Sequence, residues 1–375
     1  MDFSLIETDA GLRELIERFA DSDAVIIDTE FMRRDTFFPK AALFQLCFPA
    51  QPQTGWLVDP LKVSDFAPLR QLFSDESVVK VLHSASEDLE VFQKFLGCQP
   101  TPLFDTQRAA AFTGLRFGLG YRALVEAVSG IHIDKEQTRS NWLARPLSEE
   151  QLLYAAADVV HLLPVYRHLE EGLAQHGRLQ WVLEDSATAA HAASQPAPPS
   201  FLRVKTAWKL DSRALAILQE LCDWRDERAR RLDKPRSWIL SDKLCHELAQ
   251  RAPADTAQLR AIPELPHAVQ RKQGDVLLEL IAEVMARDAD DLPKALPRPL
   301  NPEQRNQLKR LKRAAAGIAG ELEIDTEALL PAKDYELMVR LASGQPVEQP
   351  ERWRGWRQDV LVKPLFEEVG AEVAS

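Results

Sequence analysis

Four carboxylates in separate segments of the chain have the residue types and spacing of a cation-binding site. Asp28 and Glu30 follow the apolar run 25–27, and residues two apart on a strand project from the same face. Two carboxylates on one face repel each other unless a cation joins them. The alternative is a solvated strand end with Glu30 in a turn, and this pair alone does not exclude it.

Asp88 lies in the segment HSASEDLEVFQKFL, whose apolar residues recur at helical spacing. Ser84 or Ser86 can cap this helix, which places Asp88 in the first turn, where the helix dipole favours an anion. Ordinary stabilisation of the helix end would also explain this acid, so it acquires chemical meaning only together with the others.

Tyr154 and Asp158 are four residues apart in YAAADVVHLLPVY, so a phenol and a carboxylate lie one turn apart on one helix face. The intervening alanines leave room for close packing or for a ligand. The apolar flanks predict a mostly buried helix, in which an unpaired carboxylate is costly. A buried Tyr–Asp hydrogen bond is the alternative explanation.

Taken in order, these four acids and the tyrosine resemble the DEDDy family of 3′-to-5′ exonucleases. Longer segments resemble the ribonuclease D family over most of residues 20–170, namely DTEFMRRDTFFPKAALFQL, LHSASEDLEVF, LFDTQRAAAF and NWLARPLSEEQLLYAAADV. The resemblance implies a ribonuclease H-like α/β exonuclease domain that hydrolyses RNA from its 3′ end and releases 5′-mononucleotides. It also implies that the partners are tRNA precursors and other structured RNAs with single-stranded 3′ tails.

The resemblance implies two metal ions, about 3.5 to 4 Å apart, at the site. Oxygen ligands favour Mg²⁺ or Mn²⁺, and the absence of a His/Cys cluster disfavours zinc. By the family pattern, Asp28 would bridge the metals, Glu30 and Asp158 would complete the nucleophile side, and Asp88 would serve the leaving-group side. Tyr154 would position the attacking water, and whether it also accepts the proton stays open.

Residues beside these motifs are candidates for contacts with the substrate. In the loop 33–39, Arg33 could contact phosphate and Phe37 could stack on bases, although a solvated loop covering the core is the alternative. Other positions resemble family positions near the substrate: Gln45, Arg139, Asn141, Trp142 and Arg145. A helix N-cap accounts better for Asp105, and structural roles are favoured for three histidines, His83, His161 and His168.

The elements that must position these residues alternate between strands and helices in the first half of the chain, which predicts an α/β domain with a mixed sheet. The predicted strands are 24–28, 41–48, 54–59, 78–83 and 102–105. The predicted helices are 10–20, 65–73, 86–96, 106–113, 120–128 and 148–175. The Pro/Ala/Ser stretch AASQPAPPS at 192–200 predicts a linker, and helical patterns follow it.

The segment from 211 to 266 resembles an HRDC domain, a small helical bundle found beside nuclease and helicase domains. Trp224-Arg225, the Lys234-Pro235 break and the ILSD helix start carry this resemblance. Many HRDC domains bind nucleic acid, so Arg225 is a candidate substrate residue, although neighbouring acids make a salt-bridged surface the alternative. We expect an exonuclease domain at 1–190, a linker at 191–209, an HRDC domain at 210–292 and a second, divergent HRDC-like domain at 293–375.

The last segment carries the strongest basic patch, since residues 304–320 contain no acid. Lys309, Arg310 and Arg313 lie on a predicted helix there and are further candidate RNA contacts. Trp353 and Trp356 lie among arginines, either as stacking platforms or as core-packing residues.

Composition limits the class of protein. Apolar residues make up 45% and charged residues 27%, as in globular proteins, and no apolar run approaches the ~20 residues that span a bilayer. The acidic start lacks the features of a signal peptide, so a cytoplasmic location is expected. The four isolated cysteines indicate buried thiols and neither disulfides nor a zinc site, and a monomer is expected. The net charge of −11 lies in residues 1–190, which hold 17 basic and 28 acidic residues.

Two other functions fit parts of this pattern. A DNA 3′ exonuclease would share the carboxylate set, because metal-site motifs do not read the 2′-hydroxyl. A non-catalytic nucleic-acid-binding scaffold with structural carboxylates is the other alternative, and the complete set of four acids plus Tyr154 argues against it.

Overall fold

The computed structural model describes residues 1–133 and 140–370, in which the chain forms two compact units. The first unit contains residues 1–32, 40–195 and 300–375, and the second contains residues 33–39 and 196–299. Within the described ranges, no helix is both long enough and apolar enough to cross a membrane. The exact boundaries of the four predicted domains stay a prediction.

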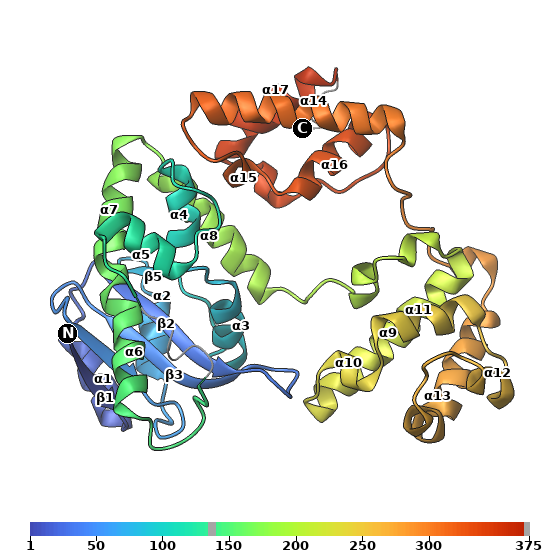
Figure 1. Cartoon of the computed structure of the whole chain (residues 1–375), viewed down its shortest axis with the longest axis horizontal. Coiled ribbons are helices and arrows are strands. Elements are labelled where there is room, and N and C mark those ends of the chain that lie inside the picture. Colours follow the sequence, from blue (N-terminus) through green and yellow to red (C-terminus); the bar gives the residue numbers. More distant parts are fainter. Residues whose placement is uncertain (134–139, 371–375) are drawn as a thin grey trace. The chain divides into compact units, whose positions relative to one another are not determined.

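A six-stranded mixed sheet forms the centre of the first unit, in the order β1-β4-β3-β2-β5-β6 (Figure 1). The strands are β1 Asp2–Ile6, β2 Ala24–Met32, β3 Lys40–Cys47, β4 Thr54–Val58, β5 Val79–Leu82 and β6 Leu103–Asp105. β3 runs antiparallel to both β2 and β4, whereas β1 is parallel to β4, and β5 is parallel to β2 and β6. The predicted mixed sheet is confirmed.

The edge strand β1 is absent from the sequence prediction, in which the helix 10–20 is the first element. Phe3 and Leu5 pack on one side of the sheet and Ile6 on the other, so β1 does have the two-residue alternation of a strand. Its only strand partner in the sheet is β4, about fifty residues away. A short strand formed through such a distant partner has a weak local signal.

Helices cover both faces of the sheet, and the alternation along β2 explains how. Val25 and Ile27 pack with α1–α3, whereas Ala24 and Ile26 pack with α4–α7. The helices are α1 Asp9–Arg18, α2 Ala67–Ser74, α3 Ser86–Phe95, α4 Thr106–Phe112, α5 Tyr121–Ser129, α6 Glu149–Val160, α7 Leu162–Gln175 and α8 Leu179–Ser194. The predicted helix 148–175 is two helices that meet at His161, and α8 was not predicted.

The C-terminal helices share a hydrophobic core with helices α4–α8, within the first unit. These helices are α14 Pro302–Glu321, α15 Thr326–Leu329, α16 Ala332–Ala342 and α17 Lys363–Glu368, with short turns η4 Glu351–Trp353 and η5 Gln358–Val362. Trp353 is buried, and Trp356 stacks on Trp181 of α8 with ring centroids 4.3 Å apart. Both tryptophans therefore pack in the core, the second of the two predicted roles.

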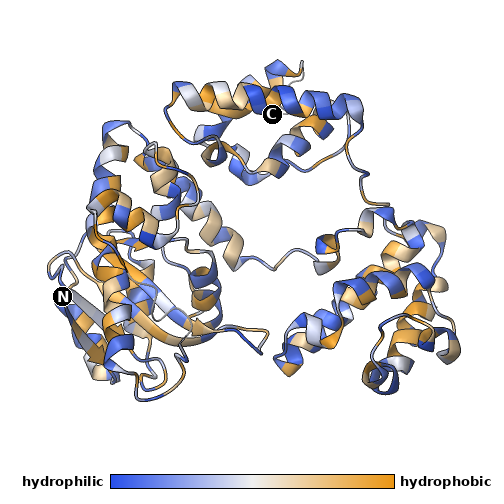
Figure 2. Ribbon diagram, in the orientation of Figure 1, coloured by the Kyte–Doolittle hydropathy of each residue, from blue (hydrophilic) through white to orange (hydrophobic). Residues whose placement is uncertain are grey.

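The second unit is a helical bundle with its own core. It contains α9 Ser212–Leu232, α10 Arg236–Ile239, α11 Asp242–Arg251, α12 Thr256–Arg260 and α13 His267–Met285, with turns η1 Ser200–Arg203, η2 Ala207–Lys209 and η3 Ala289–Asp291. Figure 2 shows hydrophobic and hydrophilic residues on different sides of these helices. All four cysteines are free, but Cys98 is partly exposed, so the prediction of four buried thiols was wrong for this one.

Candidate active site

Asp28 and Glu30 lie on β2 and project from the face that α6 covers. On the neighbouring strand β3, Gln45 pairs with Asp28 and Leu43 pairs with Glu30, and the register shifts immediately after Glu30. Leu43 packs against alanines of α6, which identifies the face. The predicted sharing of one face by the two carboxylates therefore holds in the structure.

Asp88 reaches the same place from another direction. It lies in the first turn of α3, directly after β5, which is the parallel neighbour of β2. The Thr29 hydroxyl donates a 2.5 Å hydrogen bond to Asp88 Oδ1. The Thr29 side chain projects from the opposite face of β2 to Asp28 and Glu30. This hydrogen bond therefore connects Asp88 to the strand that carries the other two acids.

Asp105 holds the turn that leads into α3. Its carboxylate accepts hydrogen bonds from the backbone N–H groups of Ser84 and Ala85 at 3.0 and 3.1 Å. Ser84 has a φ of 57°, in the left-handed region that is unfavourable for a serine. Asp105 also accepts from Gln107 N at 2.9 Å, so the predicted N-cap is present but is only part of its function.

Tyr154 and Asp158 come from α6, which begins with a reciprocal capping box between Ser148 and Gln151. The helix lies very close to the sheet, because a Cβ on Gly55 of β4 would come within 2.6 Å of the Ala156 Cβ. The alanine run next to Tyr154 thus permits close packing, one of its two predicted roles. This close approach positions Asp158, whose carboxylate accepts a hydrogen bond from the Tyr154 hydroxyl.

The four carboxylates interact electrostatically, with Asp88 and Asp158 buried and Asp28 and Glu30 partly buried. Burial raises the pKa of Asp28 to about 8, and the charge of Asp158 adds to the rise. Burial raises the pKa of Glu30 to about 10, and the other carboxylates add to it. Burial raises the pKa of Asp158 to about 7, although the Tyr154 hydrogen bond opposes the rise. Burial and the charge of Asp28 raise the pKa of Asp88 well above its ordinary value.

This donor set fits divalent cations that take part of their coordination from elsewhere. Within residues 1–133 and 140–370, no three carboxylate, histidine or cysteine side chains are arranged to hold one metal ion by themselves. Mg²⁺ usually binds one or two protein carboxylates and completes its shell with water and substrate phosphates. Buried, mutually repelling oxygen ligands are stabilised by such cations, so the residues present fit them.

Gln45 and Trp142 lie near the site but are buried. Both amide atoms of Gln45 and the indole nitrogen of Trp142 lack a hydrogen-bond partner among residues 1–133 and 140–370, and Gln45 has no exposed surface. Trp142 packs beside Tyr154, with ring centroids 6.0 Å apart. Trp142 therefore supports the tyrosine through packing.

Arg145 uses all of its N–H groups inside the fold. Its Nε and Nη2 bind the two carboxylate oxygens of Asp59, each at 2.7 Å, and the remaining N–H groups donate to the carbonyls of Ala42, Trp142 and Ala144. Asp59 is 1% exposed. This geometry assigns Arg145 a structural role in place of the predicted contact with substrate. Arg139 lies outside the described residues, and Asn141 is exposed.

Arg33, Phe37 and Arg225, three candidate substrate residues, come together in the second unit. They line a cavity of about 480 Å³ together with Arg34, Arg203 and Arg236. The Phe37 ring, however, is covered by the Arg236 guanidinium, 4.6 Å from its centroid, and Arg225 is 1% exposed. The predicted stacking of Phe37 on bases is therefore not available in this arrangement.

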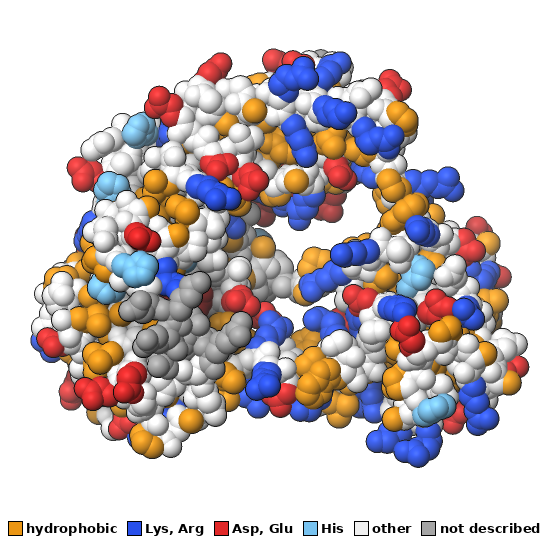
Figure 3. Space-filling model, in the orientation of Figure 1, with side chains coloured by type: hydrophobic (Ala, Val, Ile, Leu, Met, Phe, Trp, Pro, Cys, Tyr) orange, Lys and Arg blue, Asp and Glu red, His pale blue; other side chains and the backbone are white. Residues whose placement is uncertain are grey.

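The basic helix predicted near residue 309 is α14. Lys309, Arg310 and Arg313 are exposed, and Arg310 pairs with Glu368 of α17. Figure 3 shows Lys and Arg side chains gathered over this helix.

Two residues near the carboxylates were not predicted as part of the site, Thr29 and Tyr121. Tyr121 Oη donates a 3.0 Å hydrogen bond to Ala157 O, and burial together with the nearby carboxylates raises its pKa. His83 contacts Thr106 through Nδ1 at 3.0 Å and packs against the Tyr121 ring. A threonine between two acids and a tyrosine at a helix start give no signal of their own in the sequence.

The chain matches two protein-family models. A 3′-5′ exonuclease model matches residues 3–174, and an HRDC domain model matches residues 214–281. These two matches agree with the α/β part of the first unit and with the helical second unit.

Full-length relatives carry the name ribonuclease D. The chain is 41% identical to ribonuclease D of Pseudomonas paraeruginosa over 366 residues, which cover 96% of each chain. It is 32% identical to ribonuclease D of Escherichia coli over 370 residues, covering 97% of this chain and 98% of the relative. The crystal structure of Escherichia coli RNase D, described as an exoribonuclease involved in structured RNA processing, matches with a TM-score of 0.92 and 31% identity, covering 99% of both chains.

Proposed function

The chain belongs to the ribonuclease D family of metal-dependent 3′-5′ exoribonucleases, and on this premise we propose that Asp28, Glu30, Asp88 and Asp158 form its catalytic centre. The observation that supports this most is the convergence of like charges. Three separate segments, β2, α3 and α6, bring these carboxylates together, and burial together with their like charges raises their pKa values. In a purely structural site, Lys or Arg side chains would pair with these carboxylates.

Two divalent ions, Mg²⁺ or Mn²⁺, would be held by these four residues and would supply charge neutralisation and an activated water for phosphodiester hydrolysis. Asp28 lies between the other acids electrostatically, since its charge acts on both Glu30 and Asp88. This supports the bridging role implied by the family. Glu30 and Asp158 would serve the attacking side, and Asp88, held by Thr29, would serve the leaving group.

Tyr154 would position the attacking water. Its O–H is donated to Asp158, which leaves the phenol oxygen free to accept a hydrogen bond from water. A hydroxyl in this state orients a water molecule without accepting its proton.

For the substrate, we propose RNA with a single-stranded 3′ tail, including tRNA precursors, trimmed to 5′-mononucleotides by a monomeric enzyme. The structured-RNA processing named for the Escherichia coli relative supports this choice. Exposed cations on α14, Lys309 and Arg313, would bind RNA phosphate, and the arginine-rich cavity of the second unit would do the same.

The decisive experiment compares a 3′-tailed RNA with a matched DNA in Mg²⁺, Mn²⁺ or EDTA. Stepwise release of mononucleotides from RNA, abolished by EDTA, is expected. Asp88→Asn should abolish it, whereas Glu87→Gln should not, because Glu87 is an exposed acid in the same helix turn. Equal hydrolysis of DNA would favour the DNA exonuclease, and full activity of Asp88→Asn would refute the assignment of the site.

A second pair of variants tests the tyrosine. Tyr154→Phe should lower kcat by about 100-fold with little change in RNA affinity, in the range usual for loss of one positioned catalytic group. Tyr166→Phe is the matched control, because its hydroxyl hydrogen-bonds Glu170 away from the carboxylates. Equal losses of kcat and RNA affinity in Tyr154→Phe would contradict the proposed role.

A further inference from the structure

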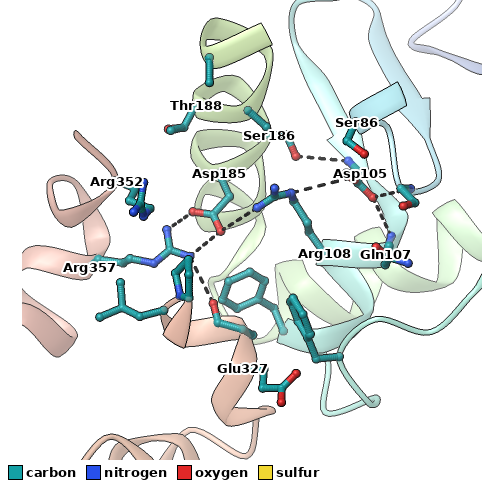
Figure 4. A pocket seen from close by; sticks show the side chains of 18 of the residues that line it. Ser86, Asp105, Gln107, Arg108, Asp185, Ser186, Thr188, Glu327, Arg352 and Arg357 are labelled. Carbon is teal, nitrogen blue, oxygen red and sulfur yellow. Dashed lines mark hydrogen bonds and ion pairs between the residues drawn. The ribbon is translucent and has the colours of Figure 1, made fainter. Parts of the chain in front are cut away.

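A second cavity, of about 850 Å³, lies within the first unit and is separate from the carboxylate faces of β2 and α6. One wall comes from the start of α3, from α4 and from α8, and the other comes from α14, α15, α16 and the segment around η4 (Figure 4). Its volume is within the range of small-molecule sites, about 300 to 1,000 Å³. The C-terminal helices therefore complete a pocket on the exonuclease-like half.

Several charges in the wall are already neutralised inside the protein. Arg357 binds Asp185 through both terminal nitrogens and donates to Leu329 O at 2.6 Å, as Figure 4 shows for its pair with Asp185. Arg352 pairs with the fully buried Asp334, with Nε 2.7 Å from Oδ2. These two arginines fasten the C-terminal segment and have a structural role.

Three other cations in the lining are not satisfied in this way. Arg108 is 42% exposed and forms only long ion pairs, 3.8 Å from Asp105 and 4.0 Å from Asp185, which are beyond hydrogen-bonding distance (Figure 4). No hydrogen bond from its guanidinium to any residue in 1–133 or 140–370 is found. Lys312 and Lys333 are exposed, and neither forms an ion pair with a described residue.

The carboxylates near these cations do not cancel them. Asp105 already accepts hydrogen bonds from three backbone N–H groups, and Asp185 is bound by Arg357. Glu327 is exposed and is the third acid of the lining, which has five cations in total. An anion is therefore the favoured ligand of this pocket.

The rest of the lining suits an aromatic, hydroxyl-bearing ligand. Leu89, Phe112 and Leu330 lie in the wall but are at most 2% exposed, so the accessible aromatic surface comes from the Phe117 ring, which is 39% exposed. Hydroxyl groups come from Ser84, Ser86 and Thr326. A nucleobase stacks on such aromatic rings, and ribose and phosphate oxygens bind hydroxyls and cations.

We propose that this cavity binds a nucleotide, with its phosphate held by Arg108, Lys312 and Lys333 and its base against the apolar wall. The choice of a nucleotide over another aromatic phosphate rests on the proposed function, because the enzyme's substrate and products are nucleotides. The ligand is either a free nucleoside 5′-monophosphate or one residue of an RNA chain, since both present the same base and phosphate.

The two sites differ in what they need in order to bind phosphate. The four carboxylates repel a phosphate unless divalent cations are present, whereas this cavity supplies its own positive charges. Binding that persists in EDTA therefore does not come from the carboxylate site, and substitutions in the cavity show whether it comes from the cavity.

The test uses the full chain with Asp28→Asn, in EDTA and low salt, titrated by calorimetry with cytidine 5′-monophosphate, cytidine, inorganic phosphate and a six-nucleotide RNA. We expect the monophosphate or the RNA to bind, and cytidine to bind at least tenfold more weakly. The double variant Lys312→Gln/Lys333→Gln, added to this background, should weaken binding at least tenfold. Adding Lys363→Gln instead should leave it unchanged, because Lys363 pairs with Asp359 outside the cavity.

Each outcome decides the proposal. Tight binding of the monophosphate alone identifies a free mononucleotide as the ligand, and tight binding of the RNA alone identifies an RNA residue. An affinity that does not change in the double variant, or no binding of either ligand in EDTA, overturns the proposal. Metal-dependent exonuclease activity of the unsubstituted chain is measured separately, so its loss would refute the proposed function without touching the result in EDTA.

Discussion

Charged side chains are buried in both units, but the carboxylate site of the first unit and the Arg225 network of the second are arranged in opposite ways. Arg225 is 1% exposed and binds Asp226, Asp242 and the Ser200 hydroxyl, so the buried charge has partners. Asp28 has other acids as neighbours, and burial together with the charge of Asp158 raises its pKa. Paired burial serves structure, whereas unpaired like charges require an external cation, which is the basis of the proposed catalysis.

The largest expected effect is on catalysis. Asp28→Asn should lower the exonuclease rate by about 1,000-fold, comparable to the loss of one group that stabilises the transition state electrostatically. The same change should raise the melting temperature in EDTA above about pH 8, where Asp28 is ionised and its charge repels the other acids. Rates on a 3′-tailed RNA and thermal melts measure the two effects. A lower melting temperature would contradict the claim that the like charges at this site, unlike the paired charge of Arg225, destabilise the fold.

Arg225→Ala should have the opposite effects, with a loss of stability and no loss of catalytic activity. Removing one partner of a buried ion pair leaves uncompensated charge, so we expect a loss of about 3 kcal/mol in the free energy of unfolding. Denaturant unfolding, followed by a signal from the second unit, measures this loss of stability. Hydrolysis of a short RNA should be unchanged at temperatures where the protein stays folded. A loss of activity without a loss of stability would contradict the structural role of Arg225.

Gly55→Ala tests whether the close packing of α6 positions the site. The added Cβ would meet Ala156, and overpacking of this kind costs about 1–3 kcal/mol. We expect lower stability together with a lower kcat, since α6 carries Tyr154 and Asp158. Gly120→Ala is the control, because its Cβ would meet nothing within 4 Å; equal effects of both variants would argue against the packing explanation.

Asp105→Ala tests a residue outside the proposed catalytic centre that holds the turn in front of Asp88. Without its carboxylate, the turn at Ser84 loses two hydrogen bonds, and Asp88 is less well positioned. We expect kcat to fall about tenfold, a change of about 1.4 kcal/mol, with Asp105→Asn retaining part of the activity. A loss of RNA affinity with unchanged kcat would rule out this positioning role.

The smallest expected effect is the pH dependence of stability in EDTA. In the folded chain the pKa of Asp28 is about 8 and that of Asp158 about 7, against about 3.9 when unfolded. The folded state therefore binds more protons between about pH 4 and 8, and its stability should fall as pH rises through this range. Melting temperatures should drop by several degrees between pH 6 and 8, and Mg²⁺ or Asp28→Asn should reduce the drop.

Local periodicity in the sequence was sufficient to predict part of the site. Strand alternation placed Asp28 and Glu30 on one face, and helix periodicity placed Tyr154 above Asp158, because both relations depend only on nearby backbone geometry. The mixed sheet and the ribonuclease D family likeness were also predicted and are confirmed. The order of the acids along the chain carried the family assignment.

Only the tertiary structure decided which charges have partners. The contacts of Thr29 with Asp88, of Asp105 with the Ser84 turn and of Arg145 with Asp59 join residues 21 to 86 positions apart. No local pattern encodes such contacts, since they depend on how strands pair and helices pack. For the same reason, only the structure shows that residues 300–370 share the core of the first unit, and that they thereby close a second cavity.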